Sequence, residues 1–148
     1  MSFIPPPRIR PIAVCVVRHG ESILVFEGHD SVKDQTFYRP LGGSIEFGEL
    51  GAEAAVREFR EEIGAELLNL KYVGALENIF TYEGHPGHEI VLVYEADIAS
   101  RDLYESQVAK GFEDGGGQFK VLWKPLSDFG PDVDLLYPEG LSKLLAAE

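Results

Sequence analysis

The segment from Leu50 to Ile63 is the strongest helical pattern in the chain, and it frames the rest of the fold. At about 100° per residue, one narrow stripe of such a helix carries apolar side chains and a separate arc carries acidic ones. The apolar stripe consists of Ala52, Val56, Phe59 and Ile63, and the acidic arc consists of Glu58, Glu61 and Glu62. Gly64 follows where a left-handed C-cap ends a helix. We therefore predict a helix over Leu50–Ile63 with one buried face and one acidic face.

The acidic arc is unfavourable for an isolated helix. Glutamates three and four residues apart repel each other by about 0.2–0.5 kcal/mol per pair, and the last helical turn prefers cations. Such local violations are typical of functional sites, and a divalent cation with oxygen ligands would relieve both penalties. The alternative is a solvated face crossed by Glu53–Arg57 and Arg57–Glu61 ion pairs, which is the commoner use of a charged helix face.

Net charge constrains the partners. The 148-residue chain carries 13 basic and 25 acidic residues, for a formal net charge of −12. This charge argues against binding a nucleic-acid polymer or an anionic membrane, because both require Lys and Arg to neutralise phosphates. A small phosphorylated ligand is not excluded, since a bound metal can invert the local field. The length and the 45% hydrophobic content fit one domain spanning residues 1–148, with a packed core of its own.

The single cysteine limits the covalent chemistry of the chain. Cys15 has no partner for an internal disulfide, and its apolar neighbours predict a buried strand thiol. Apolar runs are too short to span a membrane, and residues 1–11 lack the apolar stretch of a signal peptide. We expect a cytoplasmic protein with an extended N-terminal tail over residues 1–8.

Strand and turn signals alternate through the remainder of the chain. They predict strands at 10–17, 23–26, 36–38, 90–96 and 119–123, two short strand pieces within 67–80, and a terminal helix at 139–147. Residues 41–49 and 100–118 are predicted to be loops. This order predicts an α+β domain in which a mixed sheet carries one strong helix in mid-chain and one at the C-terminus.

A spaced pattern starts in the first of these loops and continues through the helix. Gly43 is followed after five residues by Glu49, and after seven more by Arg57-Glu58-Phe59-Arg60-Glu61-Glu62-Ile63-Gly64-Ala65. This run resembles the Nudix hydrolase signature, with every fixed identity present and only Phe59 and Ala65 unusual at apolar positions. The lead-in Arg39-Pro40-Leu41-Gly42-Gly43 is also similar to the family. The resemblance implies an α/β/α sandwich around a mixed β-sheet, and cleavage of nucleoside diphosphates linked to another moiety.

The resemblance also implies a metal site. The residues that match metal-binding positions are Glu58, Glu61 and Glu62, together with the backbone carbonyl of Gly42 or Gly43. Mg²⁺ or Mn²⁺ is the expected cofactor, since both take hard oxygen ligands. Glu49 and Arg57 match a salt bridge that holds the loop against the helix.

A carboxylate is expected to accept the proton of the attacking water. The candidates are Glu58 and Glu61 in the helix, and Glu113 in the glycine-rich loop before the last strand. The alternative for both Glu113 and Asp114 is a solvated loop acid, and it is the preferred interpretation for Asp114.

Substrate contacts are expected from Arg39 and from aromatic side chains that could stack on a base. Our candidate substrate-binding residues are Arg39, Tyr38, Phe47 and Tyr82, and Phe37 also flanks the glycine loop. The place of Tyr82 resembles that of an aromatic marker in members that act on dinucleoside polyphosphates. His85 and His88 flank a turn and are not expected to bind metal.

The expected partner is a small nucleotide, with neither a nucleic-acid polymer nor a membrane, and a homodimer is left open. Two other functions stay open: hydrolysis of nucleoside triphosphates to monophosphates in a pool-cleaning role, and non-catalytic nucleotide sensing on the same scaffold. The intact Glu58, Glu61 and Glu62 argue against the sensor, because regulators of this shape tend to lose such residues.

Overall fold

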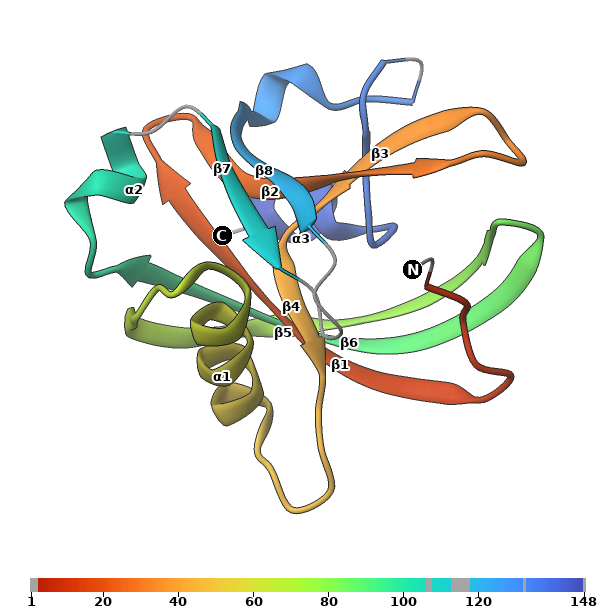
Figure 1. Cartoon of the computed structure of the whole chain (residues 1–148), viewed down its shortest axis with the longest axis horizontal. Helices are drawn as coiled ribbons and strands as arrows, with labels where there is room; N and C mark the ends of the chain where they lie inside the picture. The colour runs from red at the N-terminus through yellow and green to blue at the C-terminus, as the bar shows by residue number, and fades with distance from the viewer. Residues whose placement is uncertain (1–2, 106–107, 113–117, 132, 148) are drawn as a thin grey trace.

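The computed structural model describes residues 3–105, 108–112, 118–131 and 133–147 (Figure 1). Its strands are β1 (Ile9–His19), β2 (Ser22–Asp30), β3 (Gln35–Arg39), β4 (Leu41–Ser44), β5 (Leu67–Tyr82), β6 (His85–Ile98), β7 (Val108–Phe112), β8 (Gln118–Pro125) and β9 (Leu135–Leu136). Its helices are α1 (Gly51–Ile63), α2 (Arg101–Glu105), the 3₁₀ turn η1 (Leu126–Asp128) and α3 (Leu141–Ala146). No helix within the described ranges is long and apolar enough to cross a membrane.

Strand β1 joins the two parts of the mixed sheet. It runs parallel to β6 along Ile9–Val17, and on its other edge it pairs antiparallel with β4 at Ile12–Cys15 and with β2 at Arg18–His19. Beyond this point the strands diverge into one part ordered β5-β6-β1-β4 and another that contains β2, β3, β7, β8 and β9. The β2–β3 and β5–β6 hairpins project on the same side of the molecule (Figure 1).

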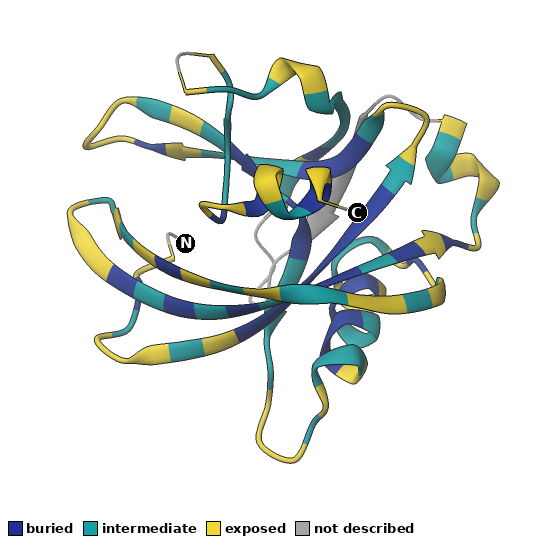
Figure 2. Ribbon diagram, turned by 180° about the vertical axis from the view of Figure 1, so that it is seen from behind, coloured by how far each residue is buried: buried dark blue, intermediate teal, exposed yellow. Residues whose placement is uncertain are grey.

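Both faces of β1 are covered, which explains its run of consecutive buried residues. Ala13, Cys15 and Val17 pack with Ala54, Ala55 and Phe59 of α1, whereas Ile12, Val14 and Val16 pack with Leu141 and Leu145 of α3. Because successive strand residues point to opposite faces, helices on both sides bury every position. The result is the expected α/β/α arrangement around a mixed sheet, with the buried residues gathered along the central strands (Figure 2). The predicted burial of Cys15 is confirmed.

Helix α1 ends at Ile63 as predicted and begins one residue later than predicted, at Gly51, but its buried face is displaced from the predicted stripe. Gly64 adopts a φ of 66°, and its N–H bonds the carbonyl of Arg60, which ends the helix after Ile63. The buried positions of the helix are Ala54, Ala55, Glu58 and Phe59, whereas Ala52, Val56 and Ile63 are only half-buried. Glu58, which was assigned to the acidic face and not to the apolar stripe, is itself buried because β4 and its glycines cover that side of the helix.

Three segments differ from the expectations for strands and loops. Residues 41–44 form β4 instead of a loop, and 67–82 form one continuous strand instead of two pieces, with irregular register near Leu68 and Tyr72. Within 100–118, which was expected to be a loop, α2 and β7 form. Weak local patterns fail in such segments because pairing with distant strands decides them.

Candidate functional site

The glycine loop begins as β4, and two glycines let its backbone approach β1 and α1. A Cβ atom at Gly42 would lie 2.0 Å from the carbonyl oxygen of Ala13, and Gly42 has a φ of +155°. A Cβ atom at Gly43 would lie 2.5 Å from Cδ of Glu58. The absence of a side chain at Gly42 therefore lets β4 lie close against β1, and its absence at Gly43 leaves the space that the buried Glu58 carboxylate occupies.

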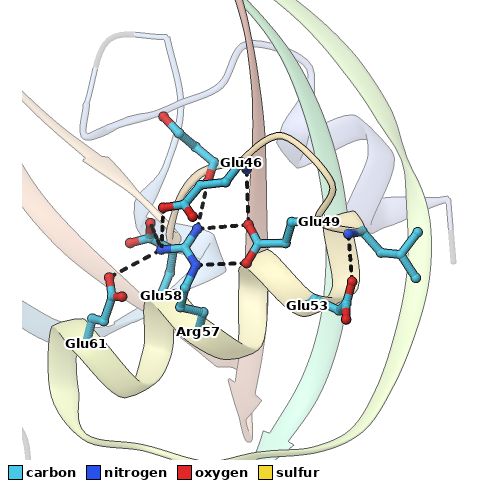
Figure 3. A network of polar contacts seen from close by, with 8 residues as sticks. Glu46, Glu49, Glu53, Arg57, Glu58 and Glu61 are labelled. Carbon is cyan, nitrogen blue, oxygen red and sulfur yellow. Dashed lines mark hydrogen bonds and ion pairs between the residues drawn. The ribbon is translucent and has the colours of Figure 1, made fainter.

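Arg57 links the loop after β4 to helix α1 (Figure 3). Its Nε and Nη2 donate to Oε2 and Oε1 of Glu49 at 2.8 and 3.0 Å, and Nη2 also donates to the carbonyl of Ser44 at 2.9 Å. This two-pronged geometry is the strongest form of a carboxylate–guanidinium pair. The hydrogen bonds from Arg57 and from the Glu46 N–H lower the pKa of Glu49 to about 2.

The remaining nitrogen of Arg57 faces the acidic arc. Nη1 lies 3.0 Å from Oε1 of Glu58 and 3.3 Å from Oε2 of Glu61. Of the two ion pairs considered for a solvated face, Arg57–Glu61 therefore forms. Glu53 instead accepts a hydrogen bond from the N–H of Leu50 at 2.8 Å and caps the start of the helix. Arg57 balances part of the repulsion that the sequence pattern implied.

The acidic arc fits a hard divalent cation by its donor chemistry. Glu58 and Glu61 converge on one positive nitrogen, and Glu62 lines the adjacent cleft together with Gly42 and Gly43. Within the described parts of the chain, no three His, Cys, Asp or Glu side chains stand close enough together to enclose an ion. Ion binding therefore requires the carboxylates to turn toward one another, which the half-exposed side chain of Glu61 has room to do.

A cleft of about 570 Å³ opens between the two hairpins, beside the glycine loop. Its walls combine aromatic, cationic and acidic groups. The aromatic residues are Phe3, Phe26, Phe37, Phe80, Tyr82, Phe119 and Tyr137. The cationic residues are Arg10, Lys33, Arg39 and Lys120, and the acidic residues are Glu27, Asp30 and Glu62. The volume suits a nucleotide-sized ligand, and the mixed lining offers both stacking surfaces and charge partners.

Two phenylalanine rings of the cleft lie over glycines of the neighbouring strands. A Cβ atom at Gly28 would lie 2.4 Å from the Phe37 ring, and one at Gly87 would lie 2.3 Å from the Phe80 ring. Phe37 also makes an edge contact with Tyr82 at 5.9 Å between ring centroids. These contacts fix the rings as walls of the cleft.

The structure brings some of the candidate substrate residues to this cleft and not others. Arg39 and Tyr82 line it. Tyr38 points to the opposite face of β3, where it is buried with Val14 and Leu141, and its hydroxyl donates to Glu27. Phe47 is fully exposed on the loop between β4 and α1. Tyr38 was a poor choice beside Arg39 because adjacent strand residues face opposite ways.

Sequence reasoning missed several residues of the cleft. The alternation Gln35, Phe37, Arg39 along β3 was the available signal, and it would have favoured Phe37 over Tyr38. Arg10 and Phe80 carried no local signal, because long-range strand pairing brings them here. His85 and His88 are not among the residues that line the cleft. Glu113 and Asp114 lie outside the described residues.

Comparison with known proteins places this geometry in a family. The model of the NUDIX domain matches residues 8–140. The chain belongs to the NUDIX family. It is similar to "NAD-capped RNA hydrolase NudC" from Pseudomonas aeruginosa PAO1, with 31% identity over 97 residues, and from Pseudomonas putida W619, with 38% identity over 97 residues. Each alignment covers 66% of this chain and 32% of the relative, so the match spans about a third of those proteins.

Solved structures show the same fold. A MutT NUDIX hydrolase from Burkholderia pseudomallei superposes with a TM-score of 0.65 at 16% identity, covering 94% of this chain and 97% of that one. A MutT protein from Bacillus halodurans gives a TM-score of 0.59 at 17% identity, covering 93% and 80%. The expected Nudix fold is thereby confirmed.

Proposed function

We propose that this NUDIX chain is a divalent-metal-dependent hydrolase that cleaves the pyrophosphate bond of a nucleoside diphosphate linked to another moiety. The observation that carries the proposal is the junction of the acidic arc with the cleft. Glu62, Gly42 and Gly43 line the same cavity as the aromatic rings and arginines. A nucleotide held by those rings would present its phosphates to oxygen donors that suit Mg²⁺ or Mn²⁺.

Each group has a role in this mechanism. Glu58, Glu61 and Glu62 would hold the cation, with the backbone carbonyl of Gly42 or Gly43 as a further ligand. When bound, the cation offsets charge on the diphosphate oxygens and lowers the pKa of a bound water. A carboxylate accepts the proton of the water that attacks phosphorus, with Glu58, Glu61 and Glu113 as candidates. Arg57 holds Glu58 and the loop in place through its hydrogen bonds.

The substrate we favour is a small dinucleotide or nucleotide derivative. NAD, the cap in the name of the P. aeruginosa and P. putida relatives, is a nucleoside diphosphate joined to a second moiety. The net charge of −12 disfavours the RNA part of a capped transcript, because the polymer would add phosphates that the surface cannot neutralise. A comparison of free NAD with NAD-capped RNA tests this preference, and faster hydrolysis of the capped RNA would contradict it.

A panel of nucleotides incubated with Mg²⁺ or Mn²⁺ tests the reaction itself, with products separated by anion-exchange chromatography. We expect phosphate-bearing products from a nucleoside diphosphate derivative, no turnover in excess EDTA, and recovery when the metal is restored. Full activity in chelator would refute the metal mechanism. Triphosphates cleaved in preference would favour the pool-cleaning alternative, and nucleotide binding without any product would favour a sensor.

Glu62 is the carboxylate of the acidic arc that lines the cleft. Glu62→Gln removes one of three like charges, so folding should be unchanged or slightly improved. Loss of a metal ligand should lower kcat on the order of 10²-fold. Glu66→Gln is the matched control, because Glu66 lies beyond the helix and pairs with Arg60. A Glu62→Gln protein that is unstable but keeps its specific activity would show a structural role.

Glu113 is our proposed loop acid. If it serves as the general base, Glu113→Gln should lower kcat by about 10²–10⁴-fold with little change in KM, and Asp114→Asn should have a smaller effect. Equal and small effects of both substitutions would mean that a helix glutamate or the metal alone activates the water.

A further inference from the structure

Two arginines of the cleft converge on one buried glutamate. Glu89 is 2% exposed, and its Oε2 accepts a hydrogen bond from Nη2 of Arg10 at 3.0 Å while its Oε1 lies 3.7 Å from Nη2 of Arg39. Arg10 and Glu89 are directly paired on the parallel strands β1 and β6, so their side chains share a face of the sheet. The group holds two positive charges against one negative charge, and its surplus charge is positive.

The surplus charge faces the cleft. Arg10 and Arg39 both line the cavity, with about one fifth of each side chain exposed. Nε of Arg10 is buried and makes no hydrogen bond within the described parts of the chain. Burial lowers the pKa of Arg10 although Glu89 acts in the opposite direction. A buried donor without an acceptor is costly, and an anion in the cleft would satisfy it.

Aromatic rings shield both guanidinium groups from water. The ring of Phe3 lies 4.7 Å from Cζ of Arg10, and the ring of Phe26 lies 5.8 Å from Cζ of Arg39. Phe3 comes from the segment before β1 and also faces the ring of Tyr82, at 6.4 Å between centroids. The charges are therefore presented in apolar surroundings, where an interaction with an anion is stronger than in water.

Two acidic residues of the same cleft are engaged by other donors. Asp30 accepts hydrogen bonds from the backbone N–H groups of Val32, Lys33 and Glu83. Glu27 accepts one from the Tyr38 hydroxyl and lies 4.0 Å from Nζ of Lys120. These partners offset much of the negative charge of Asp30 and Glu27. The two carboxylates therefore do not neutralise the surplus positive charge of Arg10 and Arg39.

We propose that Arg10 and Arg39 form a phosphate subsite of this cleft, which holds a phosphate group of the substrate without the help of a metal ion. Arg10 stands three residues along β1 from Ala13, the partner of Gly43, which is about 10 Å at the usual strand rise. The subsite thus stands apart from the acidic arc along the cleft. Guanidinium groups suit this task because their planar fork matches phosphate oxygens. The role in catalysis rests on the proposed hydrolase function, whereas the binding itself does not.

Binding of inorganic pyrophosphate in EDTA tests the subsite by isothermal titration calorimetry, independently of any hydrolysis. We expect the wild-type chain to bind pyrophosphate, and Arg10→Gln and Arg39→Gln to weaken that binding about tenfold or more, because charge-assisted hydrogen bonds are lost. Arg39→Gln keeps the hydrogen bond between Arg10 and Glu89, so this variant still tests the subsite if Arg10→Gln fails to fold. Arg8→Gln is the control, since it removes the same charge from an exposed residue nearby.

The outcomes separate this inference from the hydrolase proposal. Unchanged pyrophosphate affinity in folded Arg39→Gln, or equal weakening by Arg8→Gln, would overturn the subsite whatever the activity. No detectable binding of pyrophosphate by the wild-type chain in EDTA would overturn it as well. If the chain hydrolyses a nucleotide, Arg39→Gln should raise KM about tenfold and leave kcat nearly unchanged. If it hydrolyses nothing, the binding result stands on its own and only the proposed function fails.

Discussion

Gly43 lies against the carboxylate of Glu58, and a Cβ atom there would stand 2.5 Å from Cδ and 2.6 Å from Oε1 of that side chain. Glu58 is only 8% exposed, so its carboxylate has little room to move away. The glycine of the loop and the glutamate of the helix therefore share one space, although fourteen residues separate them in the sequence.

Gly43→Ala should consequently impair the site more than the fold. The added methyl group displaces the end of a side chain and not the backbone, so the cost in stability should be about 1–2 kcal/mol, the lower part of the range for overpacking. Displacement of the Glu58 carboxylate by about 1 Å should lower kcat on the order of 10²-fold. Steady-state kinetics and urea unfolding measure both effects. Gly74→Ala, where the new Cβ would meet only Leu144, is the control for a glycine replaced in a strand.

Gly42→Ala should behave in the opposite way. Its Cβ would lie 2.0 Å from the backbone oxygen of Ala13, and its φ of +155° is rarely adopted by other residues. Since neither backbone can yield, we expect a loss of about 2 kcal/mol or more in the free energy of unfolding. A thermal unfolding midpoint equal to that of the wild type would show that β1 and β4 can separate at this point.

The Glu49–Arg57 pair should make stability depend on pH at the acidic end. The pKa of Glu49 is about 2 in the folded protein and ordinarily 4.5, so the folded state binds fewer protons between these values. Its contribution is present above about pH 4.5 and is lost as the pH falls toward 2. Urea unfolding at several pH values should show the wild type losing its advantage over Glu49→Gln across this range. A difference that stays constant with pH would argue that the pair is not maintained in solution.

The two hairpins beside the cleft are joined at their tips. The carboxylate of Glu83, after β5, accepts hydrogen bonds from the backbone N–H and the hydroxyl of Ser31 at 2.6 Å each, and Asp30 accepts one from the N–H of Glu83 at 3.2 Å. Glu83→Ala should speed hydrogen exchange at the amide of Ser31, because the β2–β3 tip is released. NMR-detected exchange measures this effect. Glu77→Ala, an exposed acid on β5, should leave the exchange rate unchanged.

Residues close in the sequence were sufficient to define helix α1 and the acidic arc. The limits of the helix follow from a repeating apolar pattern and from Gly64, since hydrogen bonds within a helix join residues four positions apart. The contact between Glu49 and Arg57 spans eight positions and belongs to the same continuous motif. Local rules could predict these features because the interacting groups are near neighbours.

Tertiary structure alone decided which side chains meet in the cleft. Arg10 and Glu89 are 79 positions apart, and parallel pairing of β1 with β6 places them side by side. The choice between Phe37 and Tyr38 depended on which face of β3 turns inward, which the pairing of β3 with β2 and β9 settles. A one-residue change of register would exchange the faces of a strand, so the sequence of the strand by itself does not specify its neighbours. The chain thus encodes its acidic helix locally, whereas the charge and shape of its cleft arise only when distant strands pair.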